Sequence, residues 1–297
     1  MPITFGIKRV YDPFPTHRRA VAYVSGSARS GTTWLADMIA NAAGARVVFE
    51  PLHHRGPVAR PPHFIAAGDP PRELANGIDN ALRGRFRRGT VNAFQPGGIY
   101  FYRVVKDIRP GLIPAVRAVA PTLPLLHIIR HPIEVAVSRA QLDTRDNWWD
   151  TDQAIAELRA FARQPGPLAE LAATAVAAID EDLTELTRHV AIWCVENAIA
   201  RAAAIGPNCL MLRYEDLLVE PEKHLKSIEG FLGLSIDRAK LTQPTATSFR
   251  DKTAVRQLGK WRQHVDSTTA TRLLRLAAPF ALDGLYGTNP DDDLPPQ

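Results

Sequence analysis

The sequence predicts one α/β domain with a central parallel sheet flanked by helices. Short apolar runs, typical of buried strands, alternate along the chain with longer segments of helical periodicity. The 297 residues are 45% hydrophobic and 23% charged, which is enough chain and an ordinary balance for a sizeable core. We expect the domain to span residues 1–288 and an acidic, proline-rich tail at 289–297 to be disordered.

The predicted elements follow one another in strand–helix order. Gly233 is typical of a helix stop, and proline is tolerated in a first helical turn. A Pro- and Gly-rich stretch, 51–72, is expected to be a long loop. Five strands are predicted, at Val21–Ser25, Arg46–Phe49, Tyr100–Val105, Leu125–Ile129 and Leu210–Leu212. Helices are predicted over Thr32–Ala43, 72–84, Leu112–Ala120, from Pro132, over 151–164 and 168–205, and over Pro221–Leu232; in 168–205 one apolar face is expected from Leu183, Leu186, Val190, Trp193 and Cys194.

Charge and cysteine content narrow the function classes. The formal net charge of +5 favours anionic ligands without naming one. No apolar run is long enough for a membrane span, and the first residues lack the apolar stretch of a signal peptide. Cys194 and Cys209 alone cannot make a disulfide framework or a four-ligand zinc site. We therefore expect a cytoplasmic protein without nucleic-acid partners.

The strongest local signal is the segment Ser25–Trp34, SGSARSGTTW, between a predicted strand and a predicted helix. Gly26 and Gly31 have the G-x-x-x-x-G spacing of a phosphate-binding loop, the P-loop, in which backbone N–H groups and a helix N-terminus face one anion. Nucleoside triphosphatases continue with Lys, but Thr32 stands there, which argues against ATP or GTP hydrolysis. Arg29 lies inside the loop, where its guanidinium can grip the same anion. The alternative is a Gly/Ser connector without a ligand.

A second segment, Leu126–Arg139, places Arg130 at the end of a predicted strand and Ser138 in the second turn of the next helix. This placement allows a cation and a hydroxyl to converge on one anion near the helix start. Taken alone the pattern is weak, because an arginine at a strand end is often only solvated.

Together these segments resemble the sulfotransferases that use 3′-phosphoadenosine 5′-phosphosulfate (PAPS). The stretch SARSGTTW resembles their 5′-phosphosulfate loop, and IIRHPIEVAVS resembles their 3′-phosphate segment. Arg213–Leu217, RYEDL, resembles a downstream strand end, and Gly259–Arg262, GKWR, resembles a C-terminal motif of the family. The four matches come in family order over residues 21–262, and they imply a single P-loop-type domain with no metal.

The resemblance implies a role for each matching residue. The 5′-phosphate and sulfuryl group would be held by Arg29, Ser30, Gly31, Thr32 and Thr33. Trp34 would lie against adenine with Tyr214 nearby, and the 3′-phosphate would be bound by Arg130 and Ser138. The R-K-G triplet of the family is missing, so Arg256 is our substitute 3′-phosphate ligand, with Arg250 and Lys252 as rivals.

Two departures from the cytosolic small-molecule enzymes resemble the carbohydrate and tyrosyl-protein branches of the family, and a third segment resembles the carbohydrate branch. Cytosolic small-molecule sulfotransferases have Lys in the first loop and a His base after the third strand, whereas this chain has Arg29 and the sequence Val105–Arg109, VKDIR. Phe49–His54, FEPLHH, resembles a carbohydrate sulfotransferase segment, so Glu50 is the expected catalytic base. His53 and His54 are rival bases, and Arg29 and Lys106 are expected to stabilise the transferring group.

The expected activity is sulfuryl transfer from PAPS to an acceptor hydroxyl, leaving 3′-phosphoadenosine 5′-phosphate (PAP). The acceptor is expected on a carbohydrate or glycolipid; a peptide tyrosine or a small molecule is the alternative. A P-loop kinase and a non-catalytic nucleotide-binding module remain as rival classes. Two segments are candidate acceptor contacts, Arg83–Arg88 and Trp148–Trp149. The first is equally explained as a solvated basic loop, and the second as packing.

Overall fold

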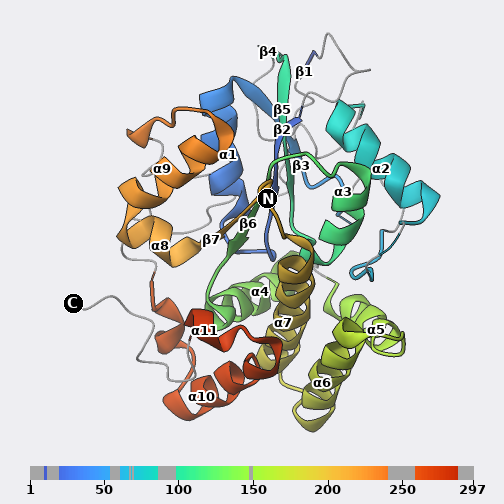
Figure 1. Cartoon of the computed structure of the whole chain (residues 1–297). Helices are drawn as coiled ribbons and strands as arrows, with labels where there is room; N and C mark the ends of the chain where they lie inside the picture. The colour runs from blue at the N-terminus through green and yellow to red at the C-terminus, as the bar shows by residue number, and fades with distance from the viewer. Residues whose placement is uncertain are drawn as a thin grey trace.

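Five parallel strands form the central sheet in the order β3-β5-β2-β6-β7 (Figure 1). The computed structural model describes residues 10–11, 20–53, 61–66, 68, 70–85, 98–146, 150–239 and 258–286. The strands are β2 (Ala20–Ser25), β3 (Ala45–Phe49), β5 (Tyr102–Asp107), β6 (Leu125–Ile129) and β7 (Cys209–Arg213); β1 (Val10–Tyr11) pairs separately with β4 (Gly98–Ile99). The predicted fold class, an α/β domain with a central parallel sheet flanked by helices, is confirmed.

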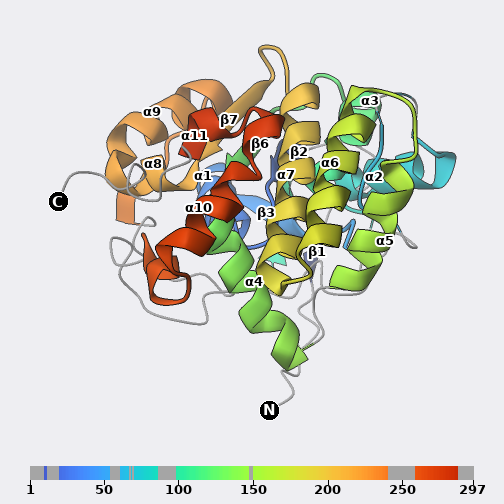
Figure 2. The same ribbon diagram turned by 90° about the horizontal axis from the view of Figure 1, so that it is seen from below.

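Helices cover both faces of the sheet and its carboxyl end. Figure 1 shows α1, α8 and α9 on one side and α2 and α3 on the other. Seen from below, α4, α7 and α10 lie across the carboxyl end between these two groups (Figure 2). The helices are α1 (Thr32–Ala43), α2 (Arg72–Arg83), α3 (Ile113–Val119), α4 (Pro132–Asp146), α5 (Thr151–Phe161), α6 (Pro167–Glu181), α7 (Glu185–Ala203), α8 (Tyr214–Val219), α9 (Pro221–Leu232), α10 (Ser267–Arg275) and α11 (Asp283–Tyr286), with short 3₁₀ turns at Pro110–Leu112, Lys260–Gln263 and Ala278–Phe280.

The strand register brings the ends of distant segments together at one edge. Ser25, the last residue of β2, is in register with Asp107 of β5 and with His127 of β6. Phe49, the last residue of β3, is in register with Lys106 of β5. In open parallel sheets, ligands bind at the carboxyl ends of the strands, at the point where successive connections lead to opposite sides of one strand. Here that strand is β2, with β5 and β3 on one side and β6 and β7 on the other.

The apolar pattern of the chain explains the layers. Alternate residues of the strands enter two clusters: Val24 and Val104 pack towards α1, and Tyr23 and Val105 pack towards α2 and α3. This alternation is the period-two geometry of a strand. A third cluster under the carboxyl end surrounds α7, whose residues Val190 to Ala200 are all buried.

The prediction of one helix over 168–205 is wrong. The chain leaves α6 at Glu181 and begins α7 at Glu185. The Thr184 side chain caps α7 by accepting from the Thr187 N–H, and Asp182 accepts from the Thr184 N–H at 3.1 Å. Leu183 lies in this break and is 73% exposed, so it does not belong to the expected apolar face. Polar caps that satisfy the free N–H groups at a helix start favour such an interruption.

Other boundaries shift by a few residues. The third strand of the sheet runs over Tyr102–Asp107 rather than Tyr100–Val105, so Lys106 and Asp107 are part of β5. The predicted helix Leu112–Ala120 is a 3₁₀ turn followed by the shorter α3. Tyr214 begins α8 and does not end a strand.

Some predictions fall outside the described residues. These concern the tail at 289–297, Trp148–Trp149 and the segment Phe86–Arg88. Within the described ranges, no helix is both long enough and apolar enough to cross a membrane.

Candidate functional site

The loop between β2 and α1 has the geometry expected of an anion-binding turn. The Ser30 N–H donates to the Ser27 carbonyl at 3.0 Å, and Arg29 and Gly31 adopt left-handed backbone conformations with φ of 77° and 91°. Gly31 directly precedes α1, and a Cβ there would lie 2.7 Å from Tyr214 Cδ2. Glycine at this position therefore permits both the turn and the close approach of Tyr214.

The second predicted segment lies against this loop. The Arg29 Nε donates to Ser138 Oγ at 3.0 Å, and Arg130 Nη1 donates to the Arg29 carbonyl at 3.0 Å. Arg130 and Ser138 come from the end of β6 and from α4, more than one hundred residues along the chain. The structure therefore joins the two segments into one basic site at the carboxyl edge.

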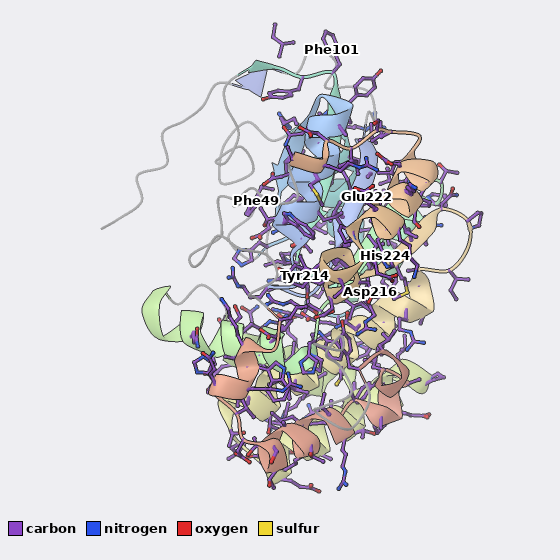
Figure 3. The ribbon with its side chains drawn as sticks, turned by 90° about the vertical axis from the view of Figure 1, so that its left-hand side faces the viewer. Phe49, Phe101, Tyr214, Asp216, Glu222 and His224 are labelled. Carbon is purple, nitrogen blue, oxygen red and sulfur yellow. The ribbon has the colours of Figure 1, made fainter. Side chains whose placement is uncertain are left out.

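Aromatic rings form one wall of the site. Trp34 of α1 and Tyr214 of α8 meet edge to face, with ring centroids 5.8 Å apart. The Arg130 guanidinium lies 4.6 Å above the Tyr214 ring, a cation–π contact. Figure 3 shows Tyr214 towards the carboxyl end of the sheet, with Phe101 at its opposite end.

One hydroxyl oxygen and one guanidinium nitrogen of the site are buried and have no hydrogen-bond partner among the described residues. Ser30 Oγ and Arg130 Nε make no hydrogen bond within the described part of the chain. Buried polar atoms of native proteins are normally paired, because an unmade hydrogen bond costs about 1–3 kcal/mol. Ser30 and Arg130 thus leave a donor set that an anion with several oxygens would satisfy.

Burial and neighbouring charges shift the pKa values of two groups of the site. Burial, and then the neighbouring Arg130, lower the pKa of Arg29, while Glu50 acts in the opposite direction. Burial raises the pKa of Tyr214, with Arg130 acting in the opposite direction. Two adjacent guanidinium groups favour an anionic ligand between them, because each disfavours the charge of the other.

Glu50 follows β3 and forms a buried ion pair with Lys106 of β5. The Glu50 N–H donates to the Lys106 carbonyl at 2.7 Å, and the Lys106 ammonium lies 4.2 Å above the Phe49 ring centroid. Glu50 is 5% exposed and has a φ of 47°, a conformation that non-glycine residues rarely adopt. β5 separates β3 from β2, so Glu50 is one strand further from the loop than a neighbour of β2 would be.

Asp107 is a functional candidate that the sequence reasoning missed. Its carboxylate accepts from the N–H groups of Leu52 at 2.9 Å, Ile108 at 2.8 Å and Arg109 at 3.1 Å. It therefore ties the turn that follows Glu50 to the end of β5. Burial raises the pKa of Asp107 to about 6, with the Leu52 N–H bond acting in the opposite direction. A polar residue at a strand end, VVKD, was the available signal.

The GKWR stretch packs under the second segment. The Trp261 ring stacks on His131 with ring centroids 5.3 Å apart, and the Trp261 backbone N–H donates to Glu134 Oε1 at 3.4 Å. Glu134 Oε2 in turn accepts from Arg130 at 3.2 Å. The match at Trp261 thus supports the Arg130 side of the site through packing.

The predicted residues meet to different degrees. Arg29, Ser30, Gly31, Arg130, Ser138, Trp34 and Tyr214 converge at one place; Thr32 and Thr33 are buried in the first turn of α1; and Glu50 and Lys106 form the ion pair beside them. His53 is buried, and its N–H donates to the Glu50 carbonyl at 3.2 Å. Arg256 and its rivals Arg250 and Lys252, like His54, lie outside the described residues. In the described ranges, no group of three His, Cys, Asp or Glu side chains could hold a metal ion.

Comparison with known proteins gave matches only among solved structures. No protein-family profile and no curated protein matches the chain. It is similar to a sulfotransferase from Alicyclobacillus acidocaldarius at 14% identity, over 90% of this chain and 95% of that one, with a TM-score of 0.45. It is also similar to the sulfotransferase domain of the Synechococcus PCC 7002 olefin synthase at 17% identity, over 92% and 96% of the two chains, with a TM-score of 0.46. Likeness at this level leaves the function to be argued from the residues of the site.

Proposed function

We propose that the protein is a sulfotransferase that moves the sulfuryl group of PAPS to an acceptor hydroxyl. The observation that carries the proposal is the contact between the loop and the second segment, Arg29 to Ser138 and Arg130 to the Arg29 carbonyl. Two segments that each resemble a different phosphate site of one nucleotide lie against each other, as a donor with a 5′- and a 3′-phosphate requires.

The residues of the site fit such a donor. The loop N–H groups of 29–33 with the Ser30 hydroxyl would face the 5′-phosphate and sulfuryl oxygens, and Arg130 with Ser138 would take the 3′-phosphate. The unpartnered Ser30 Oγ and Arg130 Nε supply donors that a phosphate oxygen satisfies. Trp34 and Tyr214 offer an aromatic wall for the adenine.

Glu50 is the proposed catalytic base. In the transfer, the acceptor oxygen forms a bond to sulfur, the bond from sulfur to the 5′-phosphate oxygen breaks, and the acceptor proton goes to the Glu50 carboxylate. Lys106 holds that carboxylate in a buried ion pair. Arg29 and Lys106 would stabilise negative charge on the transferring group, because preorganised cations in a buried site act strongly on developing charge.

The acceptor is proposed to be a carbohydrate or glycolipid hydroxyl. Support comes from the FEPLHH segment, Phe49–His54, which resembles a segment of carbohydrate sulfotransferases. A peptide tyrosine or a small molecule is the alternative acceptor. Incubation with ³⁵S-labelled PAPS and panels of glycans, glycolipids, peptides and phenols distinguishes these classes by the product that is labelled.

Calorimetry with PAP and AMP tests the donor site. Charge-assisted bonds contribute about 1.5–3 kcal/mol each, so PAP should bind at least about tenfold more tightly than AMP. Arg130→Gln should reduce the affinity for PAP to that for AMP. Equal affinity of the unaltered protein for the two nucleotides would refute the proposal, and turnover of ATP with magnesium would instead favour a kinase.

A charge-matched control separates this effect from general loss of basic charge. Arg159 of α5 forms a surface ion pair with Asp180 of α6. Exposed ion pairs contribute little to stability. Arg159→Gln should therefore leave both affinities unchanged.

A further inference from the structure

A chain of buried polar side chains lies directly beneath the loop. Ser27 Oγ donates to Glu196 Oε2 of α7 at 2.6 Å, and Arg139 Nη2 of α4 donates to the same oxygen at 2.9 Å. Arg139 Nε also donates to the Ala28 carbonyl at 3.3 Å. Arg139 and Glu196 are 0% and 1% exposed, so the ion pair is wholly removed from water.

The chain continues through Asn197 to the neighbouring strand. The Asn197 amide nitrogen donates to Ser27 Oγ at 3.1 Å and to the Trp193 carbonyl at 2.7 Å. Because both amide hydrogens are used, Asn197 Oδ1 is the acceptor for His127 Nε2 at 3.0 Å. Burial lowers the pKa of His127 to about 4, so a neutral ring with its proton on Nε2 completes the chain.

This arrangement is a poor means of stabilising a core. Removing two charges from water costs several kcal/mol per ion, and apolar residues of similar volume are often as stable or more stable. Glu196 Oε1 also has no hydrogen-bond partner among the described residues. The ion pair does hold the backbone of the loop in place, because its members bind Ser27 and Ala28, the two residues that precede Arg29.

We propose that Arg139 and Glu196 are positioning residues that hold the phosphosulfate loop in register with the 3′-phosphate segment. Arg139 follows Ser138 on α4, so one helix turn holds the Ala28 carbonyl and also receives the Arg29 side chain. The loop and the second segment are thereby fixed relative to each other before the donor binds. This inference rests on the proposed function, and it concerns residues that touch neither donor nor acceptor.

The decisive variant is the double change Arg139→Met with Glu196→Leu. It removes both charges and keeps the volume, so the melting temperature should stay within a few degrees of the unaltered protein. Hydrogen exchange at the amides of residues 28–31 should become at least about tenfold faster. The kcat with PAPS should fall at least about tenfold, because a misplacement of about 1 Å can cost a hundredfold, while KM changes less. A double variant with unchanged exchange and kcat would overturn the proposal.

Two further variants keep the test decisive. If the double variant does not fold, Ser27→Ala removes only the hydroxyl that joins the loop to Glu196, and it should speed exchange and lower kcat with little change in melting temperature. Unchanged exchange in Ser27→Ala then overturns the proposal. Arg159→Gln with Asp180→Asn is the control pair and should change nothing.

The two proposals fail in different ways. Absence of PAP binding by the unaltered protein refutes the sulfotransferase function, and the exchange rates of the loop amides then judge the positioning role alone. Normal PAP binding with loop exchange insensitive to these variants refutes the positioning role alone.

Discussion

Glu50 combines three unusual properties in one residue. Its carboxylate is paired with a buried Lys106, its side chain is nearly inaccessible, and its backbone has a φ of 47°. A left-handed conformation at a non-glycine residue costs on the order of 1–3 kcal/mol and tends to occur at active sites. The Asp107 carboxylate, which accepts from the Leu52 N–H, holds the turn that keeps Glu50 in this conformation.

Glu50→Gln tests the proposed base. The amide keeps the shape of the side chain but cannot take the acceptor proton, so kcat should fall at least about 10²-fold while PAP affinity changes little. Acceptors of low pKa should be less affected, because they arrive partly ionised. Steady-state kinetics and calorimetry measure both quantities, and Glu170→Gln on the exposed face of α6 is the control.

Near-normal kcat in Glu50→Gln together with a large loss in His53→Ala would move the base to the histidine. The melting temperature is measured alongside, since Lys106 loses its charged partner in this variant. A large fall in melting temperature with proportionate loss of PAP binding would indicate a structural role instead.

At the scale of elements, the junction of the loop with α1 depends on a single glycine. Gly31 combines a φ of 91° with a Cβ position only 2.7 Å from Tyr214. Gly44, at the other end of the same helix, has a φ of 56° and nothing within 4 Å of its Cβ position. The two glycines share the backbone requirement, and only Gly31 has the close contact.

Gly31→Ala should therefore be more damaging than Gly44→Ala. Both changes strain a left-handed residue by about 1 kcal/mol, but only the first displaces Tyr214 from beneath Arg130. We expect Gly31→Ala to weaken PAP binding at least about tenfold and Gly44→Ala to leave it unchanged. Chemical denaturation and calorimetry of the two variants measure the difference, and equal PAP affinities would contradict it.

The same scale shows what local sequence signals determine. The helices Thr32–Ala43 and Pro221–Leu232 and the strand Leu125–Ile129 have their predicted bounds, because glycine, proline and short apolar runs act locally. The α6–α7 break was missed because Leu183 imitates an apolar face. The charged end of β5 was missed because Lys106 and Asp107 are stabilised by partners from β3 and the turn after it, which no local pattern reveals.

The sequence predicts the site residues that lie within recognisable motifs and not the buried residues that support them. Arg29 and Arg130 lie together as their motifs suggest, and the register of β2 with β6 explains why. Glu196 and Asn197 were not anticipated, since they bind Ser27 across 169 and 170 residues of sequence. Their only signal is a pair of polar residues within the continuously buried stretch of α7.

In the described part of the chain, buried histidines, among them His63 with a pKa lowered by burial, oppose the partly buried Asp37 and the buried Asp107 in their effect on stability. Burial lowers the pKa of His127 to about 4 and of His189 to about 3. Below pH 6.5 the unfolded chain therefore takes up protons at these two side chains before the folded protein does, and the free energy of unfolding decreases. Burial raises the pKa of Asp37 and of Asp107 to about 6, so both favour the fold as pH falls through 6. The opposing contributions predict a shallow pH dependence of stability between pH 6.5 and 4.5.

Asp37→Asn should expose this balance. The variant lacks the carboxyl group that takes up a proton in the folded state near pH 6, and it keeps the histidines. When the pH is lowered from 6 to 4.5, its free energy of unfolding should therefore decrease by on the order of 2 kcal/mol more than that of the unaltered protein. At pH 7.5 the variant should be at least as stable, because no carboxylate is desolvated. Denaturant unfolding at a series of pH values measures both, and parallel pH profiles would contradict the prediction.

The strand order sets where an acceptor can approach. Adjacent strands lie about 4.8 Å apart, so the end of β3 and the end of β2 are separated by about 10 Å with β5 between them. On the proposed function, an acceptor hydroxyl that reaches both Glu50 and the donor approaches over the end of β5 and the residues directly after it. Asp107, Ile108 and Arg109 are all buried at this place, so they limit how far an acceptor can enter. On the proposed function, acceptor selectivity would then depend on β5 and the chain that follows it, and the loop after β2 would contact only the donor.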